Sequence, residues 1–283
     1  MANRKLDMGA AWTQATGLMA TNRDTIGAIA GLFFFLPSMA SALLVPELAN
    51  PAQPAPPPDA DPQLVMQAMM DQMTASYAEN WPILLLVVVL QFAGSMSLFA
   101  LLTDRGNPTV GEALGTGIRS LPTYLAAQII TVIGASLAIG IPLGVLSALG
   151  GSAVAVLAVL VAMILIVYVA VKLSLAAPVI AIEGQRNPFT ALARSWQLTK
   201  GNSLRIFLFI FLLLLVIGVI TVLVSGILGL VLASLGGTVA TIGGGVLNAL
   251  VSSILTVVFL VVTVAIYRQL SGHSPERQAE IFE

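Results

Sequence analysis

The chain has 283 residues, of which 58% are hydrophobic and only 9% are charged. A soluble domain carries roughly 25% charged residues, so most of the surface of this protein must face lipid rather than water. The formal net charge of −1 gives no electrostatic footprint for nucleic acid. The chain has no cysteine and a single histidine, His273, which excludes thiol chemistry and any metal site built on a histidine pair within one chain.

Uncharged apolar runs predict an all-α membrane protein with six transmembrane helices. A span needs about 20 apolar residues, because a helix rises about 1.5 Å per residue and the hydrocarbon layer is about 30 Å thick. The runs 120–171 and 206–267 are each long enough for two spans, and they divide at glycine pairs that begin at Gly150 and Gly236. We predict one integral membrane domain over 1–283, with spans at about 25–46, 81–103, 121–147, 153–176, 206–232 and 244–267.

The distribution of lysine and arginine predicts how the spans are oriented. No basic residue lies in the three segments that follow spans one, three and five, which are 47–80, 148–153 and 233–245. The segments on the other face, including the tail 268–283, all contain basic residues. Cytoplasmic segments are enriched in Lys and Arg, so we expect a multi-pass protein of the bacterial cytoplasmic (inner) membrane with both termini and this tail in the cytoplasm.

The segment 47–80 is expected outside the membrane and has two parts. A proline-rich stretch should be extended and semi-rigid. Residues 63–79 predict an amphipathic helix with a methionine stripe. Thioethers can bind Cu(I), but such a stripe is more often an adaptable apolar face, so we expect this helix to dock on the outer surface of the bundle. We predict no metal site and no cofactor.

Three short segments look alike, and each precedes an odd-numbered span. In the third, Phe189, Leu192 and Trp196 fall at i, i+3 and i+7, a spacing typical of a helix that lies in the membrane interface. The pattern predicts three repeats, each with an interfacial elbow helix followed by two spans. The segments begin at Ala11-Trp12, Asn107-Pro108 and Asn187-Pro188.

The stretch 175–202 contains a dense set of polar, proline and aromatic residues between two apolar runs: Pro178, Glu183, Pro188, Ala191, Leu192, Ser195, Trp196, Leu198, Thr199, Lys200, Gly201 and Asn202. These residues, which include the apolar Ala191, Leu192 and Leu198 as well as polar ones, resemble the signature of a bacterial family of polytopic proteins named after the membrane domain of glycerophosphoryl diester phosphodiesterase. In the phosphodiesterases of that family, catalysis belongs to a separate soluble barrel with histidines and metal-binding carboxylates. The tail 268–283 is too short for a barrel, so the resemblance implies a stand-alone membrane module without the enzyme.

Five residues form the candidate site for a lipid or a partner. Lys172 is the only charged residue inside a predicted span and lies near its cytoplasmic end. Its side chain can snorkel to the headgroups, pair with Glu183, or hold a lipid phosphate between helices. Glu183 can instead cap or pair within the elbow, where Arg194, Trp196 and Lys200 follow.

Three uncharged polar residues lie within predicted spans: Gln91, Gln128 and Asn248. Such residues usually form hydrogen bonds to other helices. If they converge with intramembrane serines, they could instead line a polar cavity. Pro37 and Pro142 are expected to bend spans one and three, which suits either a packed bundle or a transporter with interrupted helices.

The sequence favours a non-catalytic membrane protein that binds lipid or a partner in envelope homeostasis. The alternative is a transporter or channel for a small or amphiphilic solute. An enzyme is not expected, because we find no phosphate-binding loop, catalytic triad or intramembrane carboxylate pair. Membrane lipids are the expected partners, a second copy or another membrane protein is left open, and no nucleic acid is expected.

Overall fold

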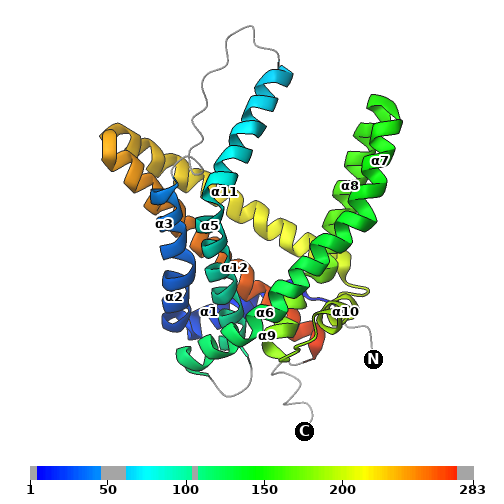
Figure 1. Cartoon of the computed structure of the whole chain (residues 1–283). Helices are drawn as coiled ribbons and strands as arrows, with labels where there is room; N and C mark the ends of the chain where they lie inside the picture. Colours follow the sequence, from blue (N-terminus) through cyan, green and yellow to red (C-terminus); the bar gives the residue numbers. More distant parts are fainter. Residues whose placement is uncertain (1–4, 46–61, 104–107, 273–283) are drawn as a thin grey trace, which may run out of the picture. The chain divides into compact units, whose positions relative to one another are not determined.

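The computed structural model describes residues 5–45, 62–103 and 108–272. These residues form helices and contain no strand (Figure 1). Six helical stretches are long and apolar enough to cross a membrane, which confirms the predicted fold class of six transmembrane helices. Their bounds are Arg23–Leu44, Leu64–Leu101, Val110–Leu149, Gly151–Ile182, Ser203–Leu235 and Gly237–Ser271.

The first span is interrupted by a wide helical turn immediately before a proline. Helix α1 (Met8–Thr21) leads into α2 (Arg23–Ala30), a π-helical segment η1 (Gly31–Phe35) and α3 (Leu36–Leu44). Pro37 lies in the first turn of α3. Proline lacks an N–H and its ring clashes with the carbonyl four residues earlier, so a wider turn before it relieves the clash.

The third span repeats this arrangement. Helix α6 (Val110–Ala135) passes into the π-helical segment η2 (Ser136–Gly140) and then into α7 (Ile141–Leu149), where Pro142 again lies in the first turn. Helix α8 (Gly151–Leu173) follows after a turn at Gly150, and Gly151 has φ of 73°. Glycine adopts this left-handed conformation without steric cost, which explains the hairpin at the predicted glycine pair.

The remaining elements complete the three last spans. Helix α9 (Ala176–Ile182) directly extends the fourth span, and α10 (Pro188–Leu198) is a short separate helix. The last hairpin joins α11 (Ser203–Leu235) to α12 (Gly237–Ser271) at Gly236, which has φ of 65°.

The chain divides into two compact units, each with its own packing. The first comprises Met1–Thr25, Ser95–Leu215 and Val258–Glu283, and the second comprises Ile26–Gly94 and Val216–Val257. The first unit buries the ends of several helices, with large side chains such as Phe99 and Tyr267 almost fully enclosed. All the candidate lipid-site residues belong to this first unit.

The second unit contains a close helix contact and the methionine stripe. A Cβ atom added at Gly94 would lie 3.0 Å from Cγ of Phe33, so glycine allows these two helices to approach. Helix α5 (Pro62–Leu101) is continuous through Pro82, whereas we predicted a separate helix over 63–79.

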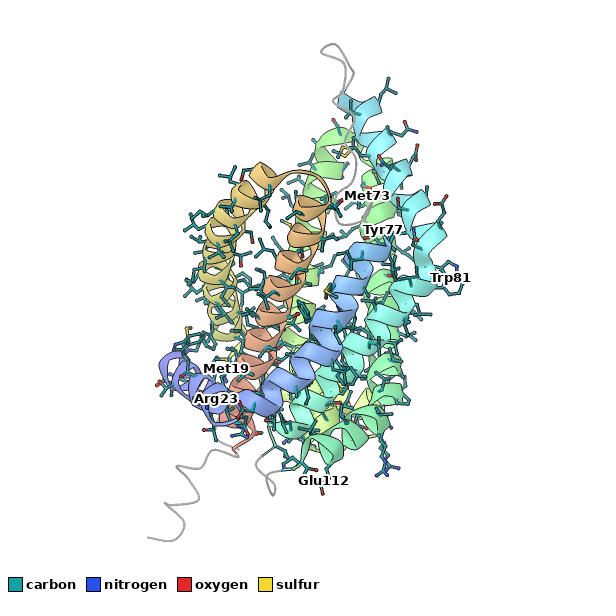
Figure 2. The ribbon with its side chains drawn as sticks, turned by 90° about the vertical axis from the view of Figure 1, so that its left-hand side faces the viewer. Met19, Arg23, Met73, Tyr77, Trp81 and Glu112 are labelled. Carbon is teal, nitrogen blue, oxygen red and sulfur yellow. The ribbon has the colours of Figure 1, made fainter. Side chains whose placement is uncertain are left out.

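The expected docking of the methionine helix on the bundle is wrong for this structure. The stripe residues are 40–62% exposed, and they are Met66, Met69, Met70 and Met73. Figure 2 shows Met73, Tyr77 and Trp81 along this half of α5. The apolar pattern predicted a helix here correctly, but its methionine side chains are exposed instead of packed against other described residues.

The three predicted elbow helices differ in form. The first is α1 and the third is α10, both separate helices. The second is not separate, because α6 runs without a break from Val110 to Ala135. The predicted apolar face of the third is exposed, with Phe189 at 66% and Trp196 at 41%, as a headgroup-facing surface requires.

Candidate functional site

The candidate site is built where α8 ends and α10 packs against it. Ser195 lies on the buried face of α10, and its hydroxyl donates to the backbone carbonyl of Lys172 at 2.8 Å. The same hydroxyl accepts from the backbone N–H of Leu175 at 3.2 Å. Thr199 adds a second donor to the Lys172 carbonyl at 3.3 Å. The last carbonyls of a helix lack partners within it, so these two hydroxyls complete the end of α8.

Lys172 is held against two aromatic rings. Its residue is only 5% exposed, and its ammonium nitrogen lies 5.6 Å from the centre of the Tyr168 ring and 5.4 Å from that of Trp196. The two rings meet edge to face, with centres 5.9 Å apart. Both rings present electron-rich π-systems to the cation, and such contacts are worth about 0.5–2 kcal/mol each.

A second cation lies close to the Lys172 ammonium and its two aromatic rings. Lys200 is exposed in the turn after α10, near enough for its charge to repel that of Lys172. Within the described residues, no carboxylate forms an ion pair with either lysine. The site therefore combines two positive charges with a half-exposed aromatic surface.

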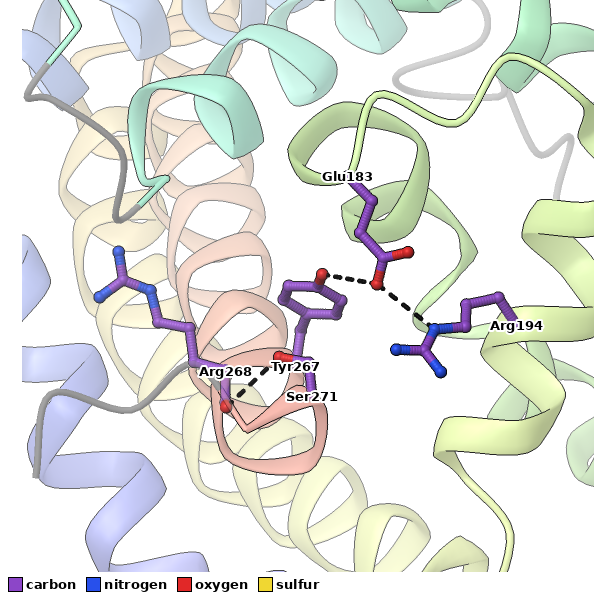
Figure 3. Close-up of polar contacts among 5 residues, drawn as sticks. All are labelled: Glu183, Arg194, Tyr267, Arg268 and Ser271. Atoms are coloured by element: carbon purple, nitrogen blue, oxygen red, sulfur yellow. Dashed lines mark hydrogen bonds and ion pairs between the residues drawn. The ribbon is translucent and has the colours of Figure 1, made fainter. Parts of the chain in front are cut away.

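The carboxylate predicted as a partner for Lys172 is engaged elsewhere. Glu183 Oε1 accepts a hydrogen bond from the Tyr267 hydroxyl at 2.9 Å and faces the Nε atom of Arg194 at 3.4 Å (Figure 3). The proposed Lys172–Glu183 pair is thus wrong, whereas the alternative, an ion pair that fixes the elbow, is confirmed. The reason is geometric, because Glu183 ends α9 and points toward α10 and α12.

Three side chains bind the N-terminal residues Leu6 and Asp7 close to the turn that follows α10. Asn202 Oδ1 accepts from the backbone N–H of Leu6 at 2.9 Å, and Arg205 donates to the Leu6 carbonyl at 3.3 Å. The N–H of Asp7 bonds to the side chain of Gln269 at 3.2 Å. Leu6 is buried, so the beginning of the described chain is fastened between α10, α11 and α12.

The comparisons give the family. The sequence profile of the membrane domain of glycerophosphoryl diester phosphodiesterase matches residues 123–278, which is more than half of the chain. The chain belongs to this family. Comparison with curated proteins and with solved structures finds no match.

Several residues that carry the family resemblance form hydrogen bonds that join helices of this domain. Ser195 and Thr199 fasten α10 to the end of α8, and Asn202 receives the N-terminal segment. Glu183 joins α9 to α12 through Tyr267. These residues hold the junction of the family domain together, with Trp196 and Lys200 exposed beside it and Lys172 almost buried behind Trp196.

The intramembrane polar residues form separate bonds. Gln91 bonds to Ser38 of α3 at 3.4 Å, across two helices as predicted. Gln128 donates to Tyr124 at 2.6 Å, and Asn248 accepts from Ser252 of its own helix at 3.2 Å. Gln128 belongs to the first unit, and Gln91 and Asn248 belong to the second.

The sequence did not predict the contacts of two residues near the site, Tyr267 and Gln269. Tyr267 and Gln269 end the last apolar run beside Arg268, which is buried and donates to the carbonyl of Leu102. Polar residues at the end of a span usually mark the interface, so their presence carried no signal of a specific partner. Only a map of contacts between distant segments could have found them.

Proposed function

We propose that this family member is a non-catalytic membrane module that binds the phosphate of anionic phospholipid headgroups at Lys172. The observation that supports this most strongly is the state of the Lys172 ammonium, which lies between two aromatic rings with no hydrogen bond to the described residues. An ammonium has three donors, and donors that leave water for the membrane without gaining an acceptor are costly. A phosphate oxygen supplies the missing acceptor.

The surroundings of Lys172 fit a lipid better than a soluble anion. Lys200 adds a second positive charge, and basic pockets between helices near the cytoplasmic surface are typical sites for lipid headgroups. Trp196 and Phe189 are exposed on α10, and aromatic side chains concentrate at the level of the headgroups. The proposed occupant thus has a phosphate for the lysines and a glycerol–acyl region for the rings.

The proposed absence of catalysis follows from the chemistry of the same site. Glu183 is the nearest carboxylate in the signature stretch, and both Tyr267 and Arg194 engage it. A general base for phosphodiester hydrolysis needs a carboxylate or histidine free to accept a proton. We further propose, from the distribution of basic residues, that the site faces the cytoplasm of a bacterium in its inner membrane.

Lipid retention during purification tests the proposal. Protein purified in mild detergent is analysed by native mass spectrometry after addition of phosphatidylglycerol or phosphatidylcholine. We expect the wild type to retain phosphatidylglycerol, and Lys172→Gln combined with Lys200→Gln to lose most of this preference. Arg119→Gln is the matched control, because Arg119 is exposed on α6 outside the site. Equal retention of both lipids, or an unchanged preference in the double variant, would contradict the proposal.

A specific observation also favours the transporter alternative. Spans one and three each contain a π-helical segment immediately before a proline, at η1 and η2. Interrupted helices at corresponding places in repeated halves are the usual pointer to a solute site in transporters. Ser136→Cys, in a chain without native cysteine, can be exposed to a membrane-impermeant thiol reagent. Labelling would support an aqueous path to η2, and lack of labelling would count against it.

A further inference from the structure

Three helices of the first unit begin in the same way. In each, the side-chain oxygen of the residue before the helix accepts a hydrogen bond from a backbone N–H two or three residues later, which is the geometry of an N-cap. The helices are α1, the start of α6, and α10. The capping residues are Asp7, Thr109 and Asn187.

The three helices share a pattern of burial that is counted from the cap. Four residues after the cap, each has a buried alanine: Ala11, Ala113 and Ala191. Eight residues after the cap, each has a buried small residue: Ala15, Gly117 and Ser195. Ten residues after the cap, each has an exposed residue: Gly17, Arg119 and Gln197. Residues four apart lie on one face of a helix, so each helix turns the same narrow face inward.

Each capped helix contacts the end of an even-numbered span, through its inward face in α6 and α10 and through its cap in α1. A Cβ atom added at Gly117 would lie 2.7 Å from Cα of Ser97, so the start of α6 packs on the end of α5. Ser195 bonds to the Lys172 carbonyl at the end of α8. Asp7, the cap of α1, bonds to Gln269 at the end of α12.

In two of the three copies, the backbone carbonyl of the residue before the cap also bonds to a side chain from another copy. The carbonyl of Arg186, before the third cap, accepts from Thr123 at 3.2 Å. The carbonyl of Leu6, before the first cap, accepts from Arg205 at 3.3 Å. Thr123 lies further along the second capped helix, α6, and Arg205 follows the third, α10. In both cases the partner therefore belongs to the preceding copy in a cyclic order.

We propose that these contacts are those of a threefold internal repeat that closes on itself. Each copy consists of a capped helix and two spans, each capped helix docks on the last span of the copy before it, and the first copy docks on the third. The start of α1, at Leu6 and Asp7, therefore binds to a docking site formed by Asn202, Arg205 and Gln269 of the same chain. The match to the family covers only residues 123–278, so the closing segment lies outside it.

The other explanation for α1 is a membrane anchor that happens to touch its neighbours. An anchor needs an apolar face toward lipid, and Trp12 at 42% exposed supplies part of one. An anchor does not need Ala11 and Ala15 to be fully enclosed. Nor does it need the N–H and the carbonyl of Leu6 to be bound by two different side chains.

Matched substitutions at equivalent positions test the repeat. Leucine is placed eight residues after each cap, in Ala15→Leu, Gly117→Leu and Ser195→Leu. The controls place it two residues further on, in Gly17→Leu, Arg119→Leu and Gln197→Leu. We expect each buried variant to lower the midpoint of thermal unfolding by roughly 2–8 °C, because overpacking a closed interface is destabilising, and each control to leave it nearly unchanged. A silent Ala15→Leu beside damaging changes at Gly117 and Ser195 would overturn the proposal.

A cross-link tests closure even if the leucine variants fail to fold. Because the chain has no cysteine, Leu6→Cys with Asn202→Cys introduces a single pair, and oxidation in intact membranes should link it. Gly17→Cys with Asn202→Cys is the control pair and should remain unlinked. A disulfide within one chain, read from gel mobility and from peptide mapping, supports closure. No disulfide, or a disulfide only between two chains, overturns it.

Discussion

At the scale of single residues, the site combines a backbone carbonyl held by two hydroxyls with a nearly buried cation. A lysine near the end of a membrane helix costs little if its ammonium can reach the headgroup layer. Lys172 lies in the last turn of α8, with its backbone carbonyl held by Ser195 and Thr199 and with its ammonium against two rings. The position of the charge is therefore set by the backbone of α8, not by a neighbouring carboxylate.

Tyr267→Phe should destabilise the first unit through Glu183. The change removes the hydroxyl that bonds to the carboxylate at 2.9 Å and leaves the buried ring in place. A hydrogen bond to a charged group contributes about 1.5–3 kcal/mol, and the partial exposure of Glu183 reduces this to about 1–2 kcal/mol. Chemical denaturation in detergent measures the loss. Tyr168→Phe is the control, and equal stability of the two variants would contradict the role assigned to Tyr267.

Ser195→Ala should cost more than the removal of an exposed hydroxyl. It leaves the Lys172 carbonyl with one donor instead of two and leaves the buried N–H of Leu175 without an acceptor. A buried donor without a partner costs about 1–3 kcal/mol. Ser147→Ala is the matched control, since Ser147 is exposed and bonds only to its own helix among the contacts seen. If both variants unfold at the same denaturant concentration, α10 is not fastened to α8 through Ser195.

At the scale of elements, small residues decide which helices can approach. Gly94 lets α5 contact Phe33 in η1, and Gly117 lets α6 contact Ser97 in α5. Other intramembrane glycines, such as Gly218 and Gly226 of α11, have open space around an added Cβ. The abundance of glycine in a membrane helix therefore does not identify a contact, because glycine occurs on packed and on lipid-facing sides alike.

Gly94→Ala should destabilise the second unit, while Gly31→Ala should not. The added methyl at Gly94 meets Phe33, whereas at Gly31 it has nothing within 4 Å. Overpacking of this kind costs about 1–3 kcal/mol, and alanine in an unhindered helix position is favourable by up to about 1 kcal/mol relative to glycine. Thermal unfolding of the two variants measures the difference. Loss of stability in Gly31→Ala of the same size would show that helix geometry, not packing, is responsible.

The elements themselves were largely predictable. Apolar runs located all six spans, and glycine pairs located both hairpins, because lipid exposure and left-handed turns leave direct marks in composition. The break expected at the border of 63–79 does not occur, since α5 tolerates Pro82 within it. The π-helical segments before Pro37 and Pro142 were expected only as bends, because proline predicts where a helix is disturbed but not how its hydrogen bonds rearrange.

At the scale of the whole molecule, the orientation in the membrane can be tested directly. The basic segments predict that Gln197 faces the cytoplasm and that Thr238, at the α11–α12 hairpin, faces outward. In the chain without cysteine, Thr238→Cys should react with an impermeant thiol reagent applied to intact cells, and Gln197→Cys should react only after permeabilisation. The reverse pattern would invert the topology and move the proposed lipid site to the outer leaflet.

Composition and local pattern were enough to predict that the protein faces lipid, that its fold is all-α, that it has six spans, and which stretch carries the family resemblance. Each of these depends on composition or on neighbours close in the chain, so one sequence is sufficient. The three-dimensional structure was needed to show that Glu183 contacts Tyr267 and Arg194 instead of Lys172, and that Asn202 binds the N–H of Leu6. Those contacts join segments far apart in the chain, and their partners depend on how the helix ends are packed, which local pattern does not encode.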